Sequence, residues 1–313
     1  MDLLSRAAAI ADDVLFPAGP APEHFDLLAR EGFYGAAGVL DLPGLAAVLR
    51  ALAGGCLTTA FVWLQHHSAV RAVADDPVLR ERWYGPLTRG ERRAGIALAG
   101  LRPGVAPLRV RAVPAGFALD GRVPWVTGWG FVDVLYVGAL ADDGTVHFLL
   151  VDTDGLPVTP LDLLAVPASN TVEVVFDGVR VPAERLTGTV SYVDWAREEA
   201  TGSALNGFLA LGVADRCGRL MGAETFDREV ESVAADLLSA DGPGVPAARA
   251  AASELALRAA AALMVHAGSR AALADSVASR LAREAMFLLV FASRPLIRAA
   301  LLTRLAGNAT RAT

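Results

Sequence analysis

Apolar residues recur at helical spacing over the first third of the chain. Near the start they fall at Leu3, Leu4, Ala7, Ile10, Ala11, Val14 and Leu15. A three- and four-residue spacing of this kind predicts a helix with one buried face. The same pattern predicts helices over 24–30, 45–52 and 58–74. We therefore predict an all-α N-terminal domain over residues 1–92.

The pattern changes to short β-rich segments after this region. Segments 134–139, 146–152 and 171–176 are rich in Val, Phe and Leu and are predicted to be strands. Turn signals are found at 119–121 and 142–144. Several short strands without intervening helices predict an antiparallel β-barrel or sandwich over residues 93–189.

The last part of the chain, residues 190–313, is rich in Ala and Leu and again has a helical pattern. Breaks are predicted near 241–244 and near Pro295. Long Ala- and Leu-rich helices favour a helical bundle. The predicted fold class is thus α+β and multi-domain: an all-α domain, a β domain and a C-terminal α-helical bundle.

Composition restricts the class of protein. The chain has 313 residues, 54% of them hydrophobic, and a formal net charge of −6. An apolar fraction this high excludes a disordered chain, and an acidic balance argues against nucleic-acid binding. The most apolar stretch, 285–302, is interrupted by Ser293, Arg294, Pro295 and Arg298, so we predict no membrane span. The apolar surplus indicates a large helical core or subunit surfaces buried in an oligomer.

The start of the chain and its cysteines predict a cytoplasmic protein. The opening residues show no secretory signal pattern. Cys56 and Cys217 lie far apart in sequence, as expected of buried, reduced thiols. All 28 basic residues are Arg, a bias that favours a GC-rich bacterial source. His66 and His67 are adjacent, so a helix would direct them about 100° apart; we predict a packing role and no metal site.

One segment, 116–128, combines a large aromatic ring with a nearby hydroxyl. We interpret it as a hairpin whose return strand places Val123, Trp125 and Thr127 on one face. An indole could stack on an aromatic cofactor while the hydroxyl fixes its orientation. The alternative is a barrel-core Trp beside a satisfied Thr, and the segment by itself leaves both interpretations open.

Several strings resemble the acyl-CoA dehydrogenase superfamily. Residues 83–91 resemble its entry to the β domain, 116–127 its "GyxLxGxKxWITxG" string, and 131–137 the continuation. Residues 168–184 resemble "xaSxTxxxxFdxVxVPxe", and 287–298 more weakly resemble the closing helix pattern. Together these strings extend over most of the chain.

The resemblance implies that FAD binds between the β domain and the C-terminal helices. It implies that Trp125 covers the flavin ring and that Thr127 hydrogen-bonds near N5. Backbone groups of Leu98 and Gly100 would contact the flavin, although the family's Thr and acidic side chains are missing there. Ser169 would lie near the nucleotide and thioester end.

The chain departs from the family at the base. Members carry a glutamate in the "YEGT" string, and Ala292 takes that position here. Some relatives place the base on the first helix after the barrel, where this chain has Gly202. Glu199, roughly a turn upstream, is the remaining candidate base; it could instead only favour a helix N-terminus.

The resemblance implies one of three functions. The first is a flavoprotein that oxidises, by α,β-desaturation, an acyl thioester on CoA or on a carrier protein. The second is a non-catalytic or half-site subunit of a heteromeric acyl-CoA dehydrogenase, and the third is a flavin-dependent enzyme of altered chemistry on the same fold. All three are consistent with a homo- or hetero-oligomer.

Overall fold

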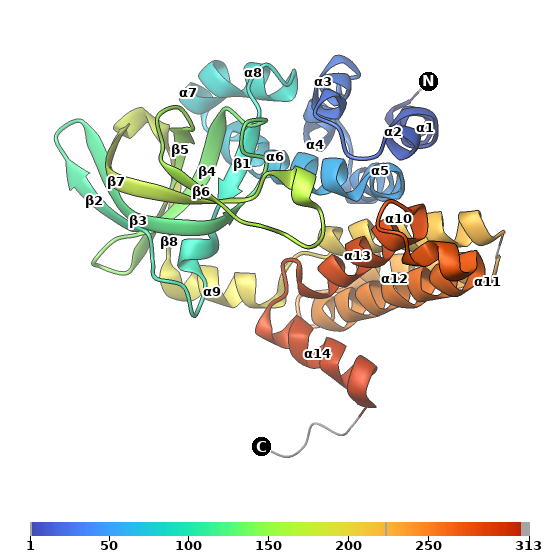
Figure 1. Cartoon of the computed structure of the whole chain (residues 1–313). Helices are drawn as coiled ribbons and strands as arrows, with labels where there is room; N and C mark the ends of the chain where they lie inside the picture. Colours follow the sequence, from blue (N-terminus) through green and yellow to red (C-terminus); the bar gives the residue numbers. More distant parts are fainter. Residues whose placement is uncertain (1, 223, 308–313) are drawn as a thin grey trace.

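The computed structural model describes residues 2–222 and 224–307. In Figure 1 helices occupy both ends of the chain and strands occupy the middle. The N-terminal helices and turns are α1 (Leu3–Ile10), η1 (Ala11–Leu15), α2 (Phe16–Ala18), α3 (Glu23–Arg30), η2 (Phe33–Gly35), α4 (Ala36–Val39), α5 (Leu42–Gly55), α6 (Leu57–Ala74), α7 (Pro77–Leu79), η3 (Arg80–Tyr84) and α8 (Gly85–Thr88).

The strands follow, with three short helical turns between them. They are β1 (Ala94–Ala97), η4 (Ala99–Leu101), β2 (Arg109–Val113), β3 (Gly116–Val126), β4 (Val134–Leu140), β5 (Thr145–Asp152), β6 (Val158–Pro160), η5 (Pro167–Ser169), β7 (Val172–Pro182), η6 (Ala183–Arg185) and β8 (Leu186–Ser191). The C-terminal helices are α9 (Tyr192–Thr201), α10 (Leu205–Met221), α11 (Thr225–Ser239), α12 (Val245–Ala267), η7 (Gly268–Ala272), α13 (Val277–Val290) and α14 (Pro295–Ala306). The predicted order of helices, strands and helices is confirmed.

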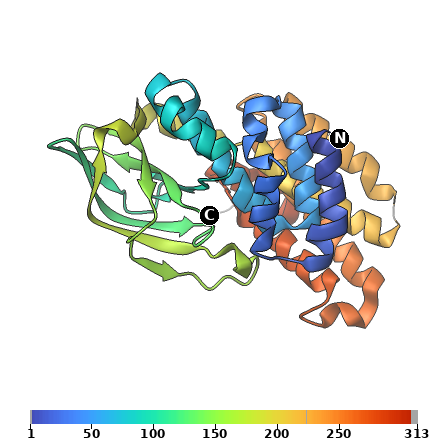
Figure 2. The ribbon, with the colours of Figure 1, turned by 90° about the horizontal axis from the view of Figure 1, so that it is seen from above.

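The strands form one mixed sheet. Its order is β6-β7-β3-β2-β4-β5-β8, and β1 pairs with β4 beside this path. Most pairs are antiparallel, as predicted, but β1–β4 and β2–β4 are parallel. Parallel pairing requires a long connection, and the chain between β1 and β4 supplies it by passing through β2 and β3. Seen from above, the sheet lies to one side of the helices (Figure 2).

The segment expected to be a hairpin is a single strand, β3, that carries two irregularities. The predicted turn at 119–121 is wrong: strand pairing with β7 continues past a register shift between Leu119 and Gly121. Gly121 has φ +139°, and the Asp120 carboxylate accepts a hydrogen bond from the Gly178 N–H at 2.8 Å. The Asp-Gly pair therefore forms a bulge in which the Asp120 carboxylate, and not a backbone carbonyl of β3, accepts the hydrogen bond from β7.

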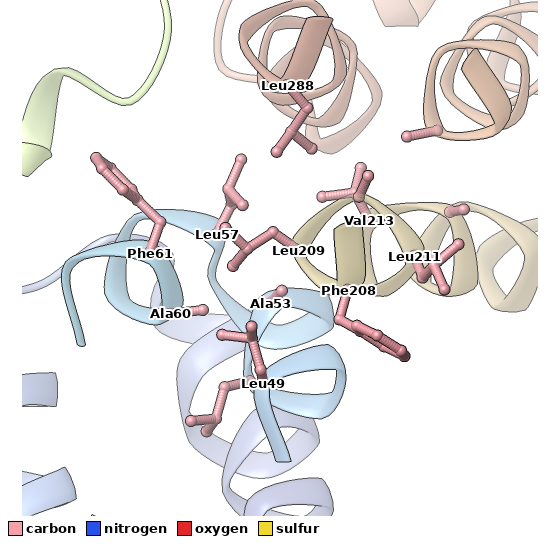
Figure 3. Close-up of a cluster of buried hydrophobic side chains, with 14 of the residues drawn as sticks. Leu49, Ala53, Leu57, Ala60, Phe61, Phe208, Leu209, Leu211, Val213 and Leu288 are labelled. Carbon is pink, nitrogen blue, oxygen red and sulfur yellow. The ribbon is translucent and has the colours of Figure 1, made fainter. Parts of the chain in front are cut away.

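The N- and C-terminal helices share one hydrophobic core. Figure 3 shows Ala53 and Leu57 from the N-terminal part beside Leu209 from the C-terminal part, with Leu288 above them. The two helical segments therefore stabilise each other, although the β segment separates them in sequence. The predicted domain limits, 1–92, 93–189 and 190–313, coincide roughly with changes of secondary structure; that they bound separate units stays a prediction.

Helices α5 and α10 approach closely because of glycine. A Cβ atom at Gly212 would lie 2.3 Å from the Arg50 carbonyl oxygen and 2.7 Å from Cβ of Ala53. We expect Gly212→Ala to lower the free energy of unfolding by about 2–3 kcal/mol, since overpacking a fixed contact costs more than the helix propensity that alanine adds. Urea unfolding measures this loss. Gly188→Ala is the control because its added methyl would meet no atom within 4 Å; equal stability of the two variants would contradict the prediction.

Helix α12 is the most apolar long helix. Together with η7 it spans Val245–Ala272, a stretch long and apolar enough, by length and composition, to cross a membrane. In the structure α12 packs against α10, α11, α13 and α14. The apolar composition of α12 is therefore that of a helix in the core of the bundle.

Candidate functional site

Outside the turn between β2 and β3, where Ala115 has φ +66°, strained backbone marks two regions of the described chain. Trp125, Val166, Asn170 and Ala292 are not glycines, yet their φ angles are between +46° and +64°. Such a left-handed conformation costs about 1–3 kcal/mol and is concentrated at functional sites. The first three residues lie around the end of β3, and Ala292 lies in the loop between α13 and α14. These two regions therefore outline the candidate site.

A row of buried hydroxyl groups lies at the end of β3. The Thr127 Oγ1 is 3.0 Å from the Thr171 Oγ1, which is 2.8 Å from the Ser169 Oγ. All three residues are buried, and the Gly128 N–H donates to the Ser169 carbonyl at 2.8 Å. Two hydrogen bonds use two of the three hydroxyl protons, so the row has one proton left to donate.

Trp125 lies beside this row but faces the surface. The indole is 59% exposed, whereas Val123 and Thr127 are buried. The expectation that the three side chains share a face is wrong, because a second register shift of β3 against β7 falls between Val123 and Val126. The bulge turns the indole outward and leaves the hydroxyl inside. Two of the predicted cofactor residues, two positions apart in the chain, thus place a ring on the surface and a hydroxyl in the buried row.

The other predicted backbone contacts lie at η4. Leu98 is half-buried and Gly100 is buried. A Cβ atom at Gly100 would lie 3.0 Å from the Leu108 backbone nitrogen. Close packing against Leu108 therefore explains why a glycine stands at this position. The contact between Gly100 and a flavin stays a prediction.

The two positions that could carry a base lie against the same arginines. Ala292 is in the loop 291–294, and Gly202 ends α9 with φ +75°. A Cβ atom at Gly202 would lie 3.7 Å from Cγ of Arg294 and 3.9 Å from Nη1 of Arg249. Neither position has a carboxylate, and Ile297, whose Cδ1 would lie 3.0 Å from a Cβ atom at Gly202, packs there together with the two arginines.

Glu199 is held by two of these arginines. Its Oε1 accepts a hydrogen bond from the Arg102 Nε at 3.1 Å and another from the Arg294 Nη2. The carboxylate therefore ties the segment after η4 to the loop before α14. Sequence reasoning selected Glu199 but missed its partners, because they are about a hundred residues away on either side.

Three phenylalanines form an apolar cluster next to Ala292, in which Phe61 is buried and Phe287 and Phe291 are half-buried. Phe61 of α6 lies 5.3 Å from Phe287 and 5.2 Å from Phe291, measured between ring centroids. Phe287 and Phe291 stack at 5.2 Å. Sequence reasoning missed this cluster too, although aromatic residues four apart on one helix were a usable signal.

His66 and the two cysteines are buried in the packed interior of the protein. The His66 Nδ1 accepts a hydrogen bond from the Ala94 N–H at 3.0 Å, and burial lowers the pKa of His66 to about 3. Cys56 and Cys217 are buried and free, and burial raises the pKa of both thiols. Within residues 2–222 and 224–307, no group of three His, Cys, Asp or Glu residues is placed to hold a metal ion.

Comparisons with known proteins find similar sequences and similar folds. No family model matches the chain. A stretch of 129 residues is 30% identical to the mitochondrial very long-chain specific acyl-CoA dehydrogenase of Macaca fascicularis; the match covers 36% of this chain and 20% of that protein. The chain therefore spans about a fifth of the length of that relative.

Solved structures match over almost the whole chain. The butyryl-CoA dehydrogenase of Megasphaera elsdenii is similar with a TM-score of 0.81, over 96% of this chain and 97% of that chain, at 16% identity. The FAD complex of PigA is similar with a TM-score of 0.79, over 98% and 97% of the two chains, at 16% identity. The fold predicted from the sequence strings is confirmed.

Proposed function

Because this chain belongs to the acyl-CoA dehydrogenase superfamily, we propose that it is a flavin-dependent oxidoreductase that desaturates an acyl thioester. The acyl group would be carried on CoA or on a carrier protein. The observation that carries the proposal is the buried hydroxyl row ending at Thr127, two residues along the chain from the exposed indole of Trp125.

These residues fit a flavin ring. An exposed indole on a strained residue has an uncovered aromatic face, and stacking on a ring system would bury it. The hydroxyl row can donate one proton, so Thr127 could hydrogen-bond a ring nitrogen at the flavin edge while Ser169 and Thr171 hold its orientation. Bound FAD would supply the hydride acceptor. The protein supplies orientation and the exclusion of water.

The thioester would lie between the flavin and the C-terminal helices. The half-buried rings of Phe287 and Phe291, packed on the buried Phe61, suit an acyl chain and would exclude water from the reacting carbons. Glu199 remains the candidate base. Since its arginine partners contact Oε1, Oε2 is the atom that would take up the α proton.

Assembly into an oligomer and a cytoplasmic location belong to the same proposal. Exposed apolar side chains on α13 and α14 support a subunit interface: Met286, Val290, Leu296 and Leu302 are each at least 47% exposed. Exposed apolar side chains grouped on two consecutive helices favour an interaction site.

The visible absorption spectrum of the purified protein tests flavin binding. We expect a flavin band that co-elutes with the protein after FAD is added. Trp125→Ala should weaken flavin retention about 10-fold, because stacking on an aromatic ring contributes about 1 kcal/mol beyond the area that it buries. Trp125→Phe should keep most of the retention, since it keeps a ring.

Two results would count against the proposal. If Trp125→Ala folds normally and retains as much flavin as the wild type, the ring is not the flavin platform. If the wild type binds no FAD at all, the oxidoreductase proposal fails.

A further inference from the structure

We propose that Arg102, Arg249 and Arg294 form a binding site for a carboxylate carried by the acyl group of the substrate. The identity of the ligand as an acyl thioester rests on the proposed function. The inference adds that the acyl group is anionic.

The three arginines converge from separate parts of the fold. Arg102 follows η4 in the β segment, Arg249 lies in α12, and Arg294 immediately precedes α14. Arg102 and Arg294 both contact Glu199. Figure 1 shows that α9, which carries Glu199, runs from the sheet toward α14. The cluster therefore lies where the β segment meets the C-terminal helices.

The charges of this cluster do not balance. Glu199 is the one carboxylate with an ion pair to these arginines among the described residues. Arg249 donates only to neutral carbonyls, from Nη1 to Ser203 at 2.9 Å and from Nη2 to Phe291 at 3.4 Å. Three guanidinium groups against one carboxylate leave two positive charges without a counter-charge.

The unbalanced charges are buried. Arg249 is 2% exposed and Arg294 is 9% exposed. The Nε of each is buried and has no hydrogen-bond partner in the part of the chain that the structure describes. Burial, with repulsion from Arg294, lowers the pKa of Arg249 to about 10. Buried charges are normally paired because desolvation is costly, so an anion entering this cluster would be strongly stabilised.

The position of the cluster points to the substrate as the source of the anion. Gly202 lies against Arg249 and Arg294, and Ala292 lies two residues before Arg294. With Gly and Ala there, no side-chain carboxylate competes for the arginines. The side chains of Arg102 and Glu199 are 28% and 24% exposed, so the cluster reaches solvent. A planar carboxylate also matches the two-donor geometry of guanidinium groups.

Succinyl-CoA and butyryl-CoA make a matched pair of probes. Both acyl groups have four carbons, and they differ by a terminal carboxylate. We expect the native, FAD-loaded protein to bind succinyl-CoA at least 10-fold more tightly than butyryl-CoA in calorimetric titrations. Arg102→Gln should reduce this ratio to near one. Arg197→Gln should leave it unchanged, because Arg197 is exposed on the same helix as Glu199 and pairs with Asp194.

The outcomes separate this inference from the proposed function. Equal binding of the two thioesters, or a preference that survives Arg102→Gln, would overturn the carboxylate site and leave the oxidoreductase standing. If neither thioester binds, succinate tests the site alone: it should raise the melting temperature of the native protein more than butyrate does at equal ionic strength, and should not do so in Arg102→Gln. Equal effects of succinate and butyrate would then overturn the inference.

Discussion

In a Glu199→Gln background, Ala292→Glu is expected to raise the rate of acyl-thioester oxidation by about 10²–10⁴-fold, the usual contribution of a positioned general base. Ala292 lies in the loop between α13 and α14, next to the apolar surface of Phe287 and Phe291 and two residues from Arg294. Its left-handed φ of +48° is already imposed on a residue with a Cβ atom, so glutamate adds length without new backbone strain. Bleaching of the flavin band under anaerobic conditions, with butyryl-CoA as substrate, measures the rate.

The control is Ala292→Gln, which has nearly the same shape and cannot accept the proton. In the same background it should leave the rate near that of Glu199→Gln alone. A glutamate variant that folds, retains flavin and oxidises the thioester no faster than the glutamine variant would show that this loop does not reach the α carbon. Glu199→Gln in the wild-type background then tests the remaining candidate base, and rescue of its loss by Ala292→Glu would link the two positions.

Glu284→Gln is expected to raise the free energy of unfolding by about 3 kcal/mol above pH 7 and to change it little below pH 4.5. Glu284 is buried in α13, and burial raises the pKa of its carboxyl from 4.5 to about 7, against the opposing charges of Arg280 and Arg283. The folded state therefore holds a proton that the unfolded state releases, so stability falls as pH rises from about 4.5 to about 7. That difference in pKa corresponds to about 3 kcal/mol.

Buried histidines act in the opposite direction and must be separated from this effect. Burial lowers the pKa of His24, His66 and His67. The unfolded state binds those protons, so stability rises with pH up to about 6.5. This rise is common to the wild type and the variant and cancels in their difference.

Urea unfolding of both proteins between pH 4.5 and 8.5 measures that difference. Glu198→Gln serves as control because Glu198 is exposed on α9; its curve should run parallel to the wild type. A Glu284→Gln curve that also stays parallel would show that the carboxyl is not protonated in the folded state.

The sequence determined the order of the elements and much of their extent. The helix predicted over 58–74 is α6, Leu57–Ala74, and the strand predicted over 146–152 is β5, Thr145–Asp152. These predictions succeeded because hydrophobic periodicity and turn residues act over a few neighbouring positions. The strings around Trp125, Thr127 and Ser169 also indicated which residues to place together, and the structure brings Thr127 and Ser169 into one hydroxyl row through Thr171.

Only the tertiary structure decided what those residues face. The bulge before Val126 turns Trp125 to the surface, and no local pattern marks it because the register depends on pairing with β7. The arginine cluster around Glu199 joins residues that are about a hundred positions apart on either side of it. Charge balance at such a point is a property of packed elements, because burial removes the water that would otherwise screen each guanidinium group.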